Sequence, residues 1–203
     1  ETISDHHEVV MTGEAISPNE SYKGLLLDKQ ASLVKLFRLF KMDGSGKGAS
    51  DADAYPGLFS LKVTADLYRK MLQPFRIRIR LPERNMPLYL LVTQVTSDGA
   101  LALDKAGATQ PVPHEFIISH WDGEISWVYP YESDNKQLIE GMYGGQVLKV
   151  QEMLRSAGHD VGASGVFDNV MSEAVIDFQQ EMGIKADGVV GNRTKALLYQ
   201  VAG

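Results

Sequence analysis

Three short helical patterns occupy the chain beyond residue 144. In each, mostly apolar side chains recur at i, i+3, i+4 and i+7, which is the spacing of one face of an α-helix. The three series are Val147, Val150, Gln151 and Leu154; Met171, Ala174, Val175 and Phe178; and Thr194, Leu197, Leu198 and Val201. Helices this short are not stable alone in water, so we expect the three faces to pack on one another as a small bundle.

Two similar glycine-containing turns separate these patterns. Gly165-Val166-Phe167-Asp168-Asn169 precedes the second helix, and Gly188-Val189-Val190-Gly191-Asn192 precedes the third. Asp168 is expected to cap the second helix, and Asn192 or Thr194 the third, by accepting hydrogen bonds from free backbone N–H groups. Glycine suits positions with positive φ. The repeated turn-plus-helix unit indicates an internal duplication.

Two further helices are expected before the bundle. Apolar spacing predicts them over residues 28–41 and 60–72. Ser60 lies at the start of the second, where a hydroxyl is a good N-cap.

Strand patterns follow these helices. Residues 75–81 alternate strictly, so Phe75, Ile77, Ile79 and Leu81 face a core. Arg76, Arg78 and Arg80 then share the opposite face, which either receives an anionic partner or is a solvated face balanced by acidic neighbours. Two hairpins are expected next, joining residues 88–95 to 100–104 and residues 114–119 to 124–129.

Composition narrows the class of protein. The 203 residues allow one ordinary domain and a small one. The net charge of −6 argues against a general nucleic-acid binder, which is usually basic. The chain has no cysteine, which removes disulfides and thiolate chemistry together, and no apolar run long enough to cross a bilayer. It begins with Glu, so we expect a processed form or a fragment whose membrane anchor lies upstream.

The last sixty residues resemble the three-helix type of peptidoglycan-binding domain. The matching positions are Val147, Gln151, Leu154, Gly158, Gly165, Phe167, Asp168, Ala174, Val175, Phe178, Gln179, Gly183, Asp187, Gly188, Gly191, Thr194 and Leu197. The resemblance implies that peptidoglycan is the ligand. We expect its contacts at turns and helix starts: free N–H groups at Gly188–Gly191 and the side chains of Asp187, Asn192, Arg193 and Thr194. Gln151 and Gln179 either contact the ligand as well or tie a helix to a loop.

The preceding part resembles a degenerate papain-like fold of the C39 peptidase type. The layout from Leu33 onwards is similar to the periplasmic region of the type II secretion protein A family, through Gly57-Leu58-x-x-Leu61, Ser97-Asp98-Gly99 and Trp121-Asp122-Gly123. The expected class is therefore α+β, with a flexible lead-in at residues 1–24, a C39-like domain at 25–135 that ends in a linker at 130–135, and the peptidoglycan-binding bundle at 136–203. The resemblance implies a periplasmic location, an ATPase and a membrane span upstream, and a secretion-pathway B protein and a secretin as partners.

The C39-like domain is expected to be inactive and to use no cofactor or metal. By the resemblance, its nucleophile position falls near Ser60, its histidine position near Leu88 and its aspartate position near Asp104. A hydroxyl is a poor nucleophile without a nearby base, and no glutamine between residues 42 and 60 can supply an oxyanion donor. The alternative is a zinc-dependent peptidoglycan hydrolase or amidase that uses His114, His120 and Asp122, with Glu115 nearby.

Overall fold

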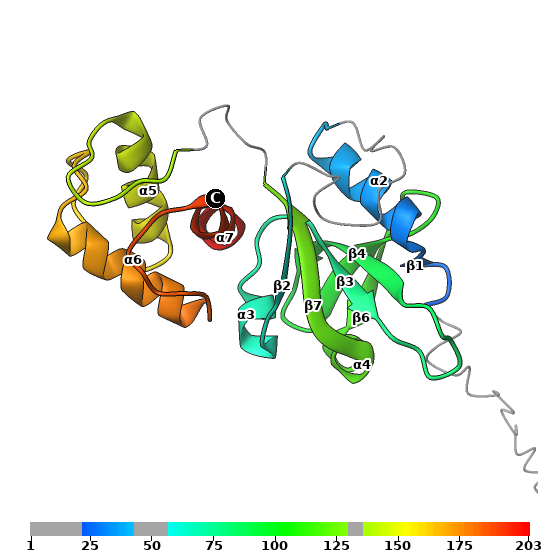
Figure 1. Ribbon diagram of the computed structural model, residues 1–203. Helices are drawn as coiled ribbons and strands as arrows, with labels where there is room; N and C mark the ends of the chain where they lie inside the picture. The colour runs from blue at the N-terminus through cyan, green and yellow to red at the C-terminus, as the bar shows by residue number, and fades with distance from the viewer. Residues whose placement is uncertain (1–21, 43–56, 130–135) are drawn as a thin grey trace, which may run out of the picture.

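The computed structural model describes residues 22–42, 57–129 and 136–203. The expected linker, and all of the expected lead-in except its last three residues, fall outside these ranges. The described chain forms an antiparallel sheet flanked by helices, followed by a three-helix bundle (Figure 1). The α+β class predicted from the sequence is confirmed.

Seven strands form one sheet in the order β2-β7-β3-β4-β5-β6, with β1 added beside β4. Every pair of neighbours is antiparallel. The strands are β1 (Leu26–Leu27), β2 (Leu58–Lys62), β3 (Phe75–Ile79), β4 (Leu88–Val95), β5 (Gly99–Leu103), β6 (Thr109–Pro113) and β7 (Trp121–Val128). The hairpin expected around Ser97-Asp98-Gly99 is therefore confirmed, as β4 and β5.

Both faces of the central strands are covered. On β4, Leu90 and Leu91 are neighbours in sequence and both are fully buried, because they point to opposite faces of the sheet. Leu91 packs under α2 (Lys29–Leu39), whereas Leu90 belongs to a larger core on the other face. Asp28 caps α2 by accepting a hydrogen bond from the Ala31 N–H at 2.7 Å, as a helix start requires. The helix expected over residues 28–41 is confirmed.

The face with three arginines is not one continuous solvated surface. Arg76 lies under α2 with 4% of its surface exposed, where it donates to the Ser32 hydroxyl at 3.0 Å and stacks over the Tyr89 ring. Arg78 instead pairs with Asp122 and Glu124, at 2.6 and 2.7 Å. Arg80 also binds Asp122, at 2.9 Å. The alternation was predicted correctly, and the pairing with acidic neighbours holds for Arg78 and Arg80, but α2 covers this face at Arg76.

Two predicted elements are wrong. Ser60 starts no helix: it lies in β2, and its hydroxyl donates to Ser126 Oγ on β7 at 2.9 Å. The helix in this region is only α3 (Ala65–Arg69), capped by Thr64, which accepts from the Leu67 N–H. Strand pairing with β7, which is distant in sequence, overrides the local helical spacing.

The second wrong element is the hairpin expected around Asp122-Gly123. Its first strand is instead the helix α4 (His114–His120), which leads directly into β7. Pro113 lies in the extended conformation just before the helix and ends the edge strand β6. Phe116 and Ile117 then bury one side of α4 in the larger core.

The bundle consists of α5 (Gly145–Ser156), α6 (Asn169–Glu181) and α7 (Asn192–Ala202). The three predicted faces are confirmed, since eleven of their twelve side chains are buried and Val201 is half-buried. Asp168 also caps α6 as expected, by accepting from the Met171 N–H at 2.9 Å.

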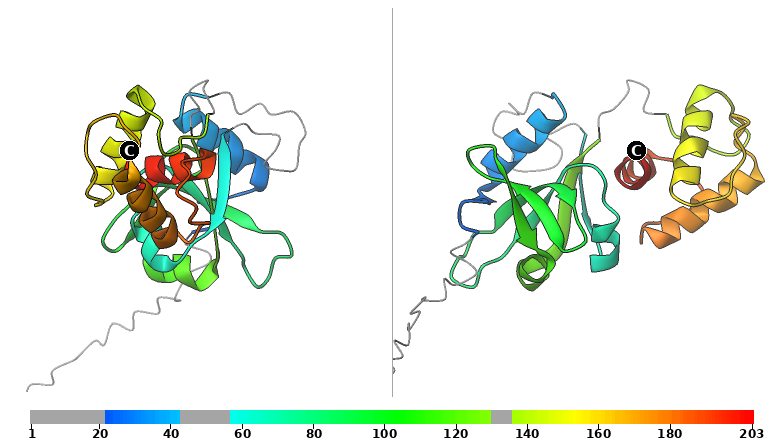
Figure 2. Two further views of the ribbon diagram at one scale, coloured as in Figure 1. Left: turned by 60° about the vertical axis from the view of Figure 1, so that its left-hand side comes forward. Right: turned by 180° about the vertical axis from the view of Figure 1, so that it is seen from behind.

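The helix α7 belongs to the bundle and also packs against the sheet domain. It lies between the sheet and the other two helices, as Figure 1 and the rear view in Figure 2 show. The Trp127 indole N–H on β7 donates to the Ala196 carbonyl at 3.0 Å. Gln200 makes two hydrogen bonds with the segment after α3: its backbone carbonyl accepts from the Leu72 N–H, and its side-chain amide donates to the Gln73 backbone carbonyl, each at 2.9 Å. The larger apolar core runs without interruption from the sheet into the bundle.

Candidate functional site

The loop between α6 and α7 is built around one buried glutamine. Gln179 has 1% of its surface exposed. Its carbonyl oxygen accepts from the N–H groups of Asp187 and Gly188, at 2.9 and 3.0 Å. Its amide donates to the Val189 carbonyl at 2.9 Å, and it also contacts the Thr194 hydroxyl and the Asp187 carboxylate. This side chain therefore ties the helix to the loop, the second of the two roles proposed for it.

Gln151 does the same in the first loop. Its carbonyl oxygen accepts from the Gly165 N–H at 2.8 Å, and its amide donates to the Val166 carbonyl at 3.0 Å. Gly165 and Gly188 have φ of +68° and +71°, a conformation in which only glycine is free of strain. Both turns thus have the same glycine conformation and the same pair of glutamine contacts, which fits the repeat seen in the sequence.

The backbone groups at Gly188–Gly191 are not available to a ligand. The Gly188 N–H is held by Gln179, and the Val189 N–H by the Asp187 carboxylate at 3.1 Å. The Val190 and Gly191 N–H groups donate to the carbonyls of Leu138 and Val189. The prediction of free N–H donors in this turn is wrong, because these groups are already bonded, by the loop itself and by the Leu138 carbonyl.

The side chains predicted beside this turn are placed differently from one another. Asp187 is tied into the loop, and the Val189 N–H, with the Lys185 ammonium second, holds the pKa of its carboxyl below the ordinary value. Thr194 is buried against Gln179. Neither Asn192 nor Thr194 caps α7, since Gly191 occupies the cap position and offers no side chain. Asn192 and Arg193 remain accessible, so a ligand contact there stays a prediction.

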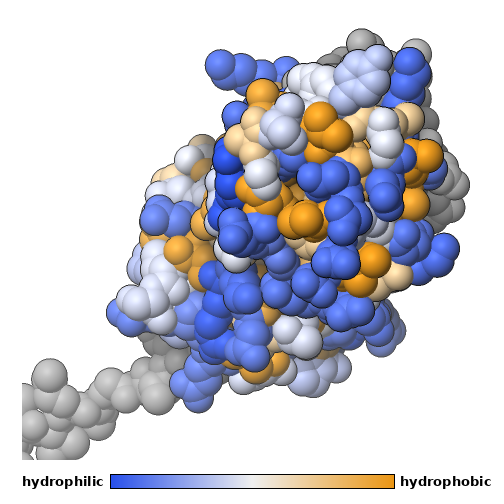
Figure 3. Space-filling view, turned by 90° about the vertical axis from the view of Figure 1, so that its left-hand side faces the viewer, coloured by the Kyte–Doolittle hydropathy of each residue, from blue (hydrophilic) through white to orange (hydrophobic). Residues whose placement is uncertain are grey.

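The bundle also presents apolar surface to solvent. Its outward side shows hydrophobic areas set among hydrophilic ones (Figure 3). Nine large apolar residues are exposed in the described part of the chain, and five belong to the bundle domain: Ile139, Met142, Tyr143, Val166 and Val170. Tyr143, Met142 and Leu138 also line a pocket of about 460 Å³.

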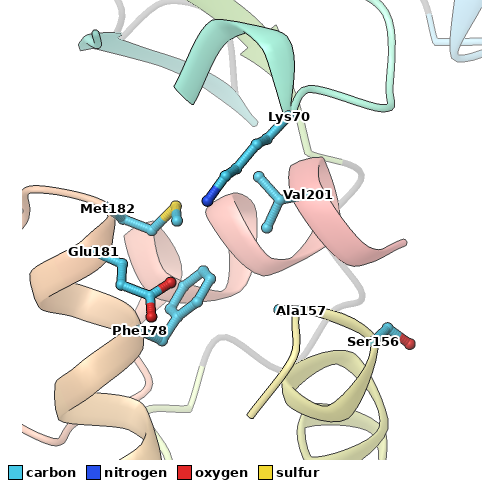
Figure 4. Close-up of a pocket in the computed structure, with 7 residues that line it drawn as sticks. All are labelled: Lys70, Ser156, Ala157, Phe178, Glu181, Met182 and Val201. Carbon is cyan, nitrogen blue, oxygen red and sulfur yellow. The ribbon is translucent and has the colours of Figure 1, made fainter. Parts of the chain in front are cut away.

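A second cavity, of about 300 Å³, lies where the two domains meet. Lys70 enters it from the end of α3, and Glu181 and Phe178 reach it from α6 (Figure 4). Its floor is apolar and is completed by Met182 and Val201.

The positions that the resemblance implies for catalytic residues do not come together. Ser60 on β2 and Leu88 on β4 are separated by β7 and β3, which puts them three strand spacings apart, roughly 14 Å. Asp104 closes a surface turn by accepting from the N–H groups of Gly107 and Ala108, at 2.7 and 2.8 Å. These N–H groups, Ala108 first, hold the pKa of Asp104 below the ordinary value.

The residues proposed for the zinc alternative each make hydrogen bonds to different partners. The two ring nitrogens of His114 contact the Tyr68 hydroxyl at 3.2 Å and the Thr96 carbonyl at 3.1 Å. His120 contacts a carbonyl of its own helix, and Asp122 binds Arg78 and Arg80. Residues 22–42, 57–129 and 136–203 contain no group of three or more His, Cys, Asp or Glu side chains that could hold a metal ion. Within the same ranges, no helix has the length and apolar character needed to cross a bilayer.

Comparison with known proteins finds a family match for the bundle. Residues 143–198 match the family described as "Putative peptidoglycan binding domain". A curated relative, the "Probable N-acetylmuramoyl-L-alanine amidase" of Bacillus licheniformis, is 39% identical over 64 residues. That alignment covers 30% of this chain and 18% of the amidase, so the chain corresponds to under a fifth of that protein.

Comparison with solved structures extends to the sheet domain. A periplasmic domain of the EpsAB fusion protein of the Vibrio vulnificus type II secretion system is similar over 87% of this chain and 80% of its own, with 18% identity and a TM-score of 0.53. The peptidase domain of Streptococcus ComA, a bi-functional ABC transporter, is similar over 53% of this chain and 99% of its own, with 15% identity and a TM-score of 0.42. The chain thus carries a domain of the peptidoglycan-binding family at residues 143–198, within a fold similar to that of the EpsAB periplasmic domain.

Proposed function

We propose that this chain is a non-catalytic peptidoglycan-binding module that works in the periplasm as part of a type II secretion protein of the A type. The observation that carries the proposal is the family match at residues 143–198, in which a buried glutamine bonds each loop through both its amide nitrogen and its carbonyl oxygen. The similar fold of a periplasmic domain of a type II secretion protein supports the rest.

The sheet domain serves in this proposal as a scaffold rather than an enzyme. Ser60 is bonded to another serine, Asp104 is used in a turn, and the two lie on different parts of the sheet. The sequence supplies no cysteine to act as nucleophile. Because α7 fixes the bundle to this domain, wall binding would hold the sheet domain in a set orientation, available to a secretion-pathway B protein and a secretin.

Co-sedimentation of the full chain with purified peptidoglycan sacculi tests the proposal. The chain is expected to pellet with sacculi, to remain in solution with cellulose particles of similar size, and to be released by excess soluble muropeptides. The supernatant is assayed for released muropeptides in the same tubes. Binding without release supports the proposal, release of soluble fragments would identify a hydrolase, and no binding would show that the bundle has another ligand.

The secretion assignment needs its own test. The full chain is mixed with the purified periplasmic region of a secretion-pathway B protein, with and without sacculi, and complex formation is followed by light scattering. A complex supports the assignment. Sacculus binding without any such complex would leave a wall-binding module of a different system.

A further inference from the structure

Tyr143 is the most exposed large apolar residue in the described chain. Its exposed fraction is 84%, whereas tyrosine rings usually bury most of their apolar body. It is also the first residue of the segment that matches the peptidoglycan-binding family. An aromatic ring left in solvent in this way marks a candidate contact surface.

The backbone that carries Tyr143 is held on both sides. Tyr143 pairs with Val166 in an isolated antiparallel bridge. The Gly144 N–H donates to the Gly165 carbonyl, and the Phe167 N–H to the Met142 carbonyl, each at 2.8 Å. Because the backbone is fixed before any ligand arrives, a contact made by the ring costs little ordering of the chain.

The neighbours of Tyr143 extend its surface. Val166 lies directly opposite it across the bridge, so the two side chains share a face, and 44% of Val166 is exposed. Met142 is 36% exposed. We call the surface made by Tyr143 and Val166 the Tyr143 face; Met142 lines the pocket beside it.

The pocket of about 460 Å³ beside this face has mixed chemistry. Leu138 and Val147 give it apolar walls, and Lys136 and Gln146 bring a cation and an amide. Its volume is within the range of small-ligand sites, about 300–1,000 Å³. An apolar platform beside a few polar groups suits a ligand that is itself apolar on one side and rich in hydrogen-bonding groups at its edge.

A pyranose ring has this character, since its C–H groups form an apolar face and its hydroxyl and acetamido groups lie around the edge. We propose that the Tyr143 face is the sugar-binding platform of the domain, on which the Tyr143 ring stacks against an N-acetylated sugar of a glycan strand while the pocket receives its polar substituents. The proposal rests on the proposed function for the class of ligand. It places the contact beside the first turn, at Val166, and not on the N–H groups at Gly188–Gly191, which are already bonded.

The test measures binding of the full chain and its variants to sacculi, and to peptide-free glycan strands prepared from them. Tyr143→Ala is expected to weaken both at least tenfold, and Tyr143→Trp to keep them within about twofold, because an aromatic face is retained. Met86→Ala is the matched control, since Met86 is 77% exposed in the sheet domain and its loss should change neither. Thermal midpoints of all variants should equal that of the wild type, which shows that a loss of binding is not a loss of fold.

The outcomes separate this proposal from the one on which it rests. If the wild type fails to bind sacculi, the proposed function is wrong, and the sugar platform with it. If the wild type binds and Tyr143→Ala binds equally, only the platform is wrong. Binding to sacculi but not to peptide-free glycan would assign recognition to the stem peptide, and a change of oligomeric state with unchanged sacculus binding would assign the face to a second protein; each overturns the platform.

Discussion

Replacing Gln179 by alanine should destabilise the bundle far more than the same change at its neighbour Gln180. Gln179 is buried and makes five hydrogen bonds, four to the α6–α7 loop and one to Thr194 in α7, whereas Gln180 is exposed on the same helix. Both changes remove the same atoms and have the same effect on helix propensity. The difference in the free energy of unfolding between the two variants therefore measures what the Gln179 hydrogen bonds contribute.

The magnitude follows from the groups left without partners. The Gln179→Ala variant loses the acceptor of two backbone N–H groups, those of Asp187 and Gly188. The Val189 carbonyl keeps a partner, because the Gly191 N–H also donates to it. An unsatisfied buried donor costs about 1–3 kcal/mol. Asp187 is at the surface and water reaches its side of the loop, so we take the lower end of that range and expect a total of about 2–3 kcal/mol.

Urea denaturation followed by far-ultraviolet circular dichroism measures this loss, with Gln180→Ala in parallel. For a chain of this size the corresponding drop in thermal midpoint is about 5–10 °C. Sacculus binding should fall as well, since the loop loses its support. A Gln179→Ala variant within about 0.5 kcal/mol of Gln180→Ala would refute the reasoning, because changes of that size are ordinary at surface positions.

Two further predictions concern the sheet domain. Trp127→Phe removes the indole donor to the Ala196 carbonyl and leaves space in the core. We expect the free energy of unfolding, measured in urea, to fall by about 2–3 kcal/mol. A fall below about 0.5 kcal/mol would show that the contact with α7 contributes little. Burial raises the pKa of Asp122, but hydrogen bonds from Arg78 and Arg80 more than offset it and hold the pKa below the ordinary value. Its contribution to stability is therefore present above about pH 4 and lost as pH falls through the lowered pKa, so Asp122→Asn should flatten the fall of thermal midpoint between neutral and acid pH. If the thermal midpoint of Asp122→Asn falls as steeply toward acid pH as that of the wild type, this account is contradicted.

The bundle could be predicted because its signals are local. Helical spacing sets the buried faces of α5, α6 and α7, and Asp168 caps a helix that starts at the next residue. The same holds for α2 and for the hairpin of β4 and β5, whose partners are near in sequence. Each of these elements needs little information from distant parts of the chain.

The errors arise where distant segments decide. Ser60 lies in a strand because β7, more than sixty residues later, pairs with it. Arg76 shares a face with Arg78, but alternation cannot tell that α2 covers only one end of that face. The free N–H groups expected after Gly188 are bonded by groups such as the Leu138 carbonyl, which lies some fifty residues earlier.

The Tyr143 face was missed although a signal was present. An aromatic residue flanked by glycines, in Gly141-Met142-Tyr143-Gly144-Gly145, is typical of a ring displayed at a turn. The exposure of the ring depends on the bridge to Val166, which local spacing does not reveal.

The position of α7 between the two domains also determines when each domain can finish folding during synthesis. Asn192–Ala202 follows every other element in the chain, yet it closes the bundle and covers Trp127 and the segment after α3. While the chain is being synthesised, neither domain can complete its packing until these residues emerge. The apolar surface awaiting α7 stays open to chaperones and proteases until that moment, so quality control acts on both domains through a single late step.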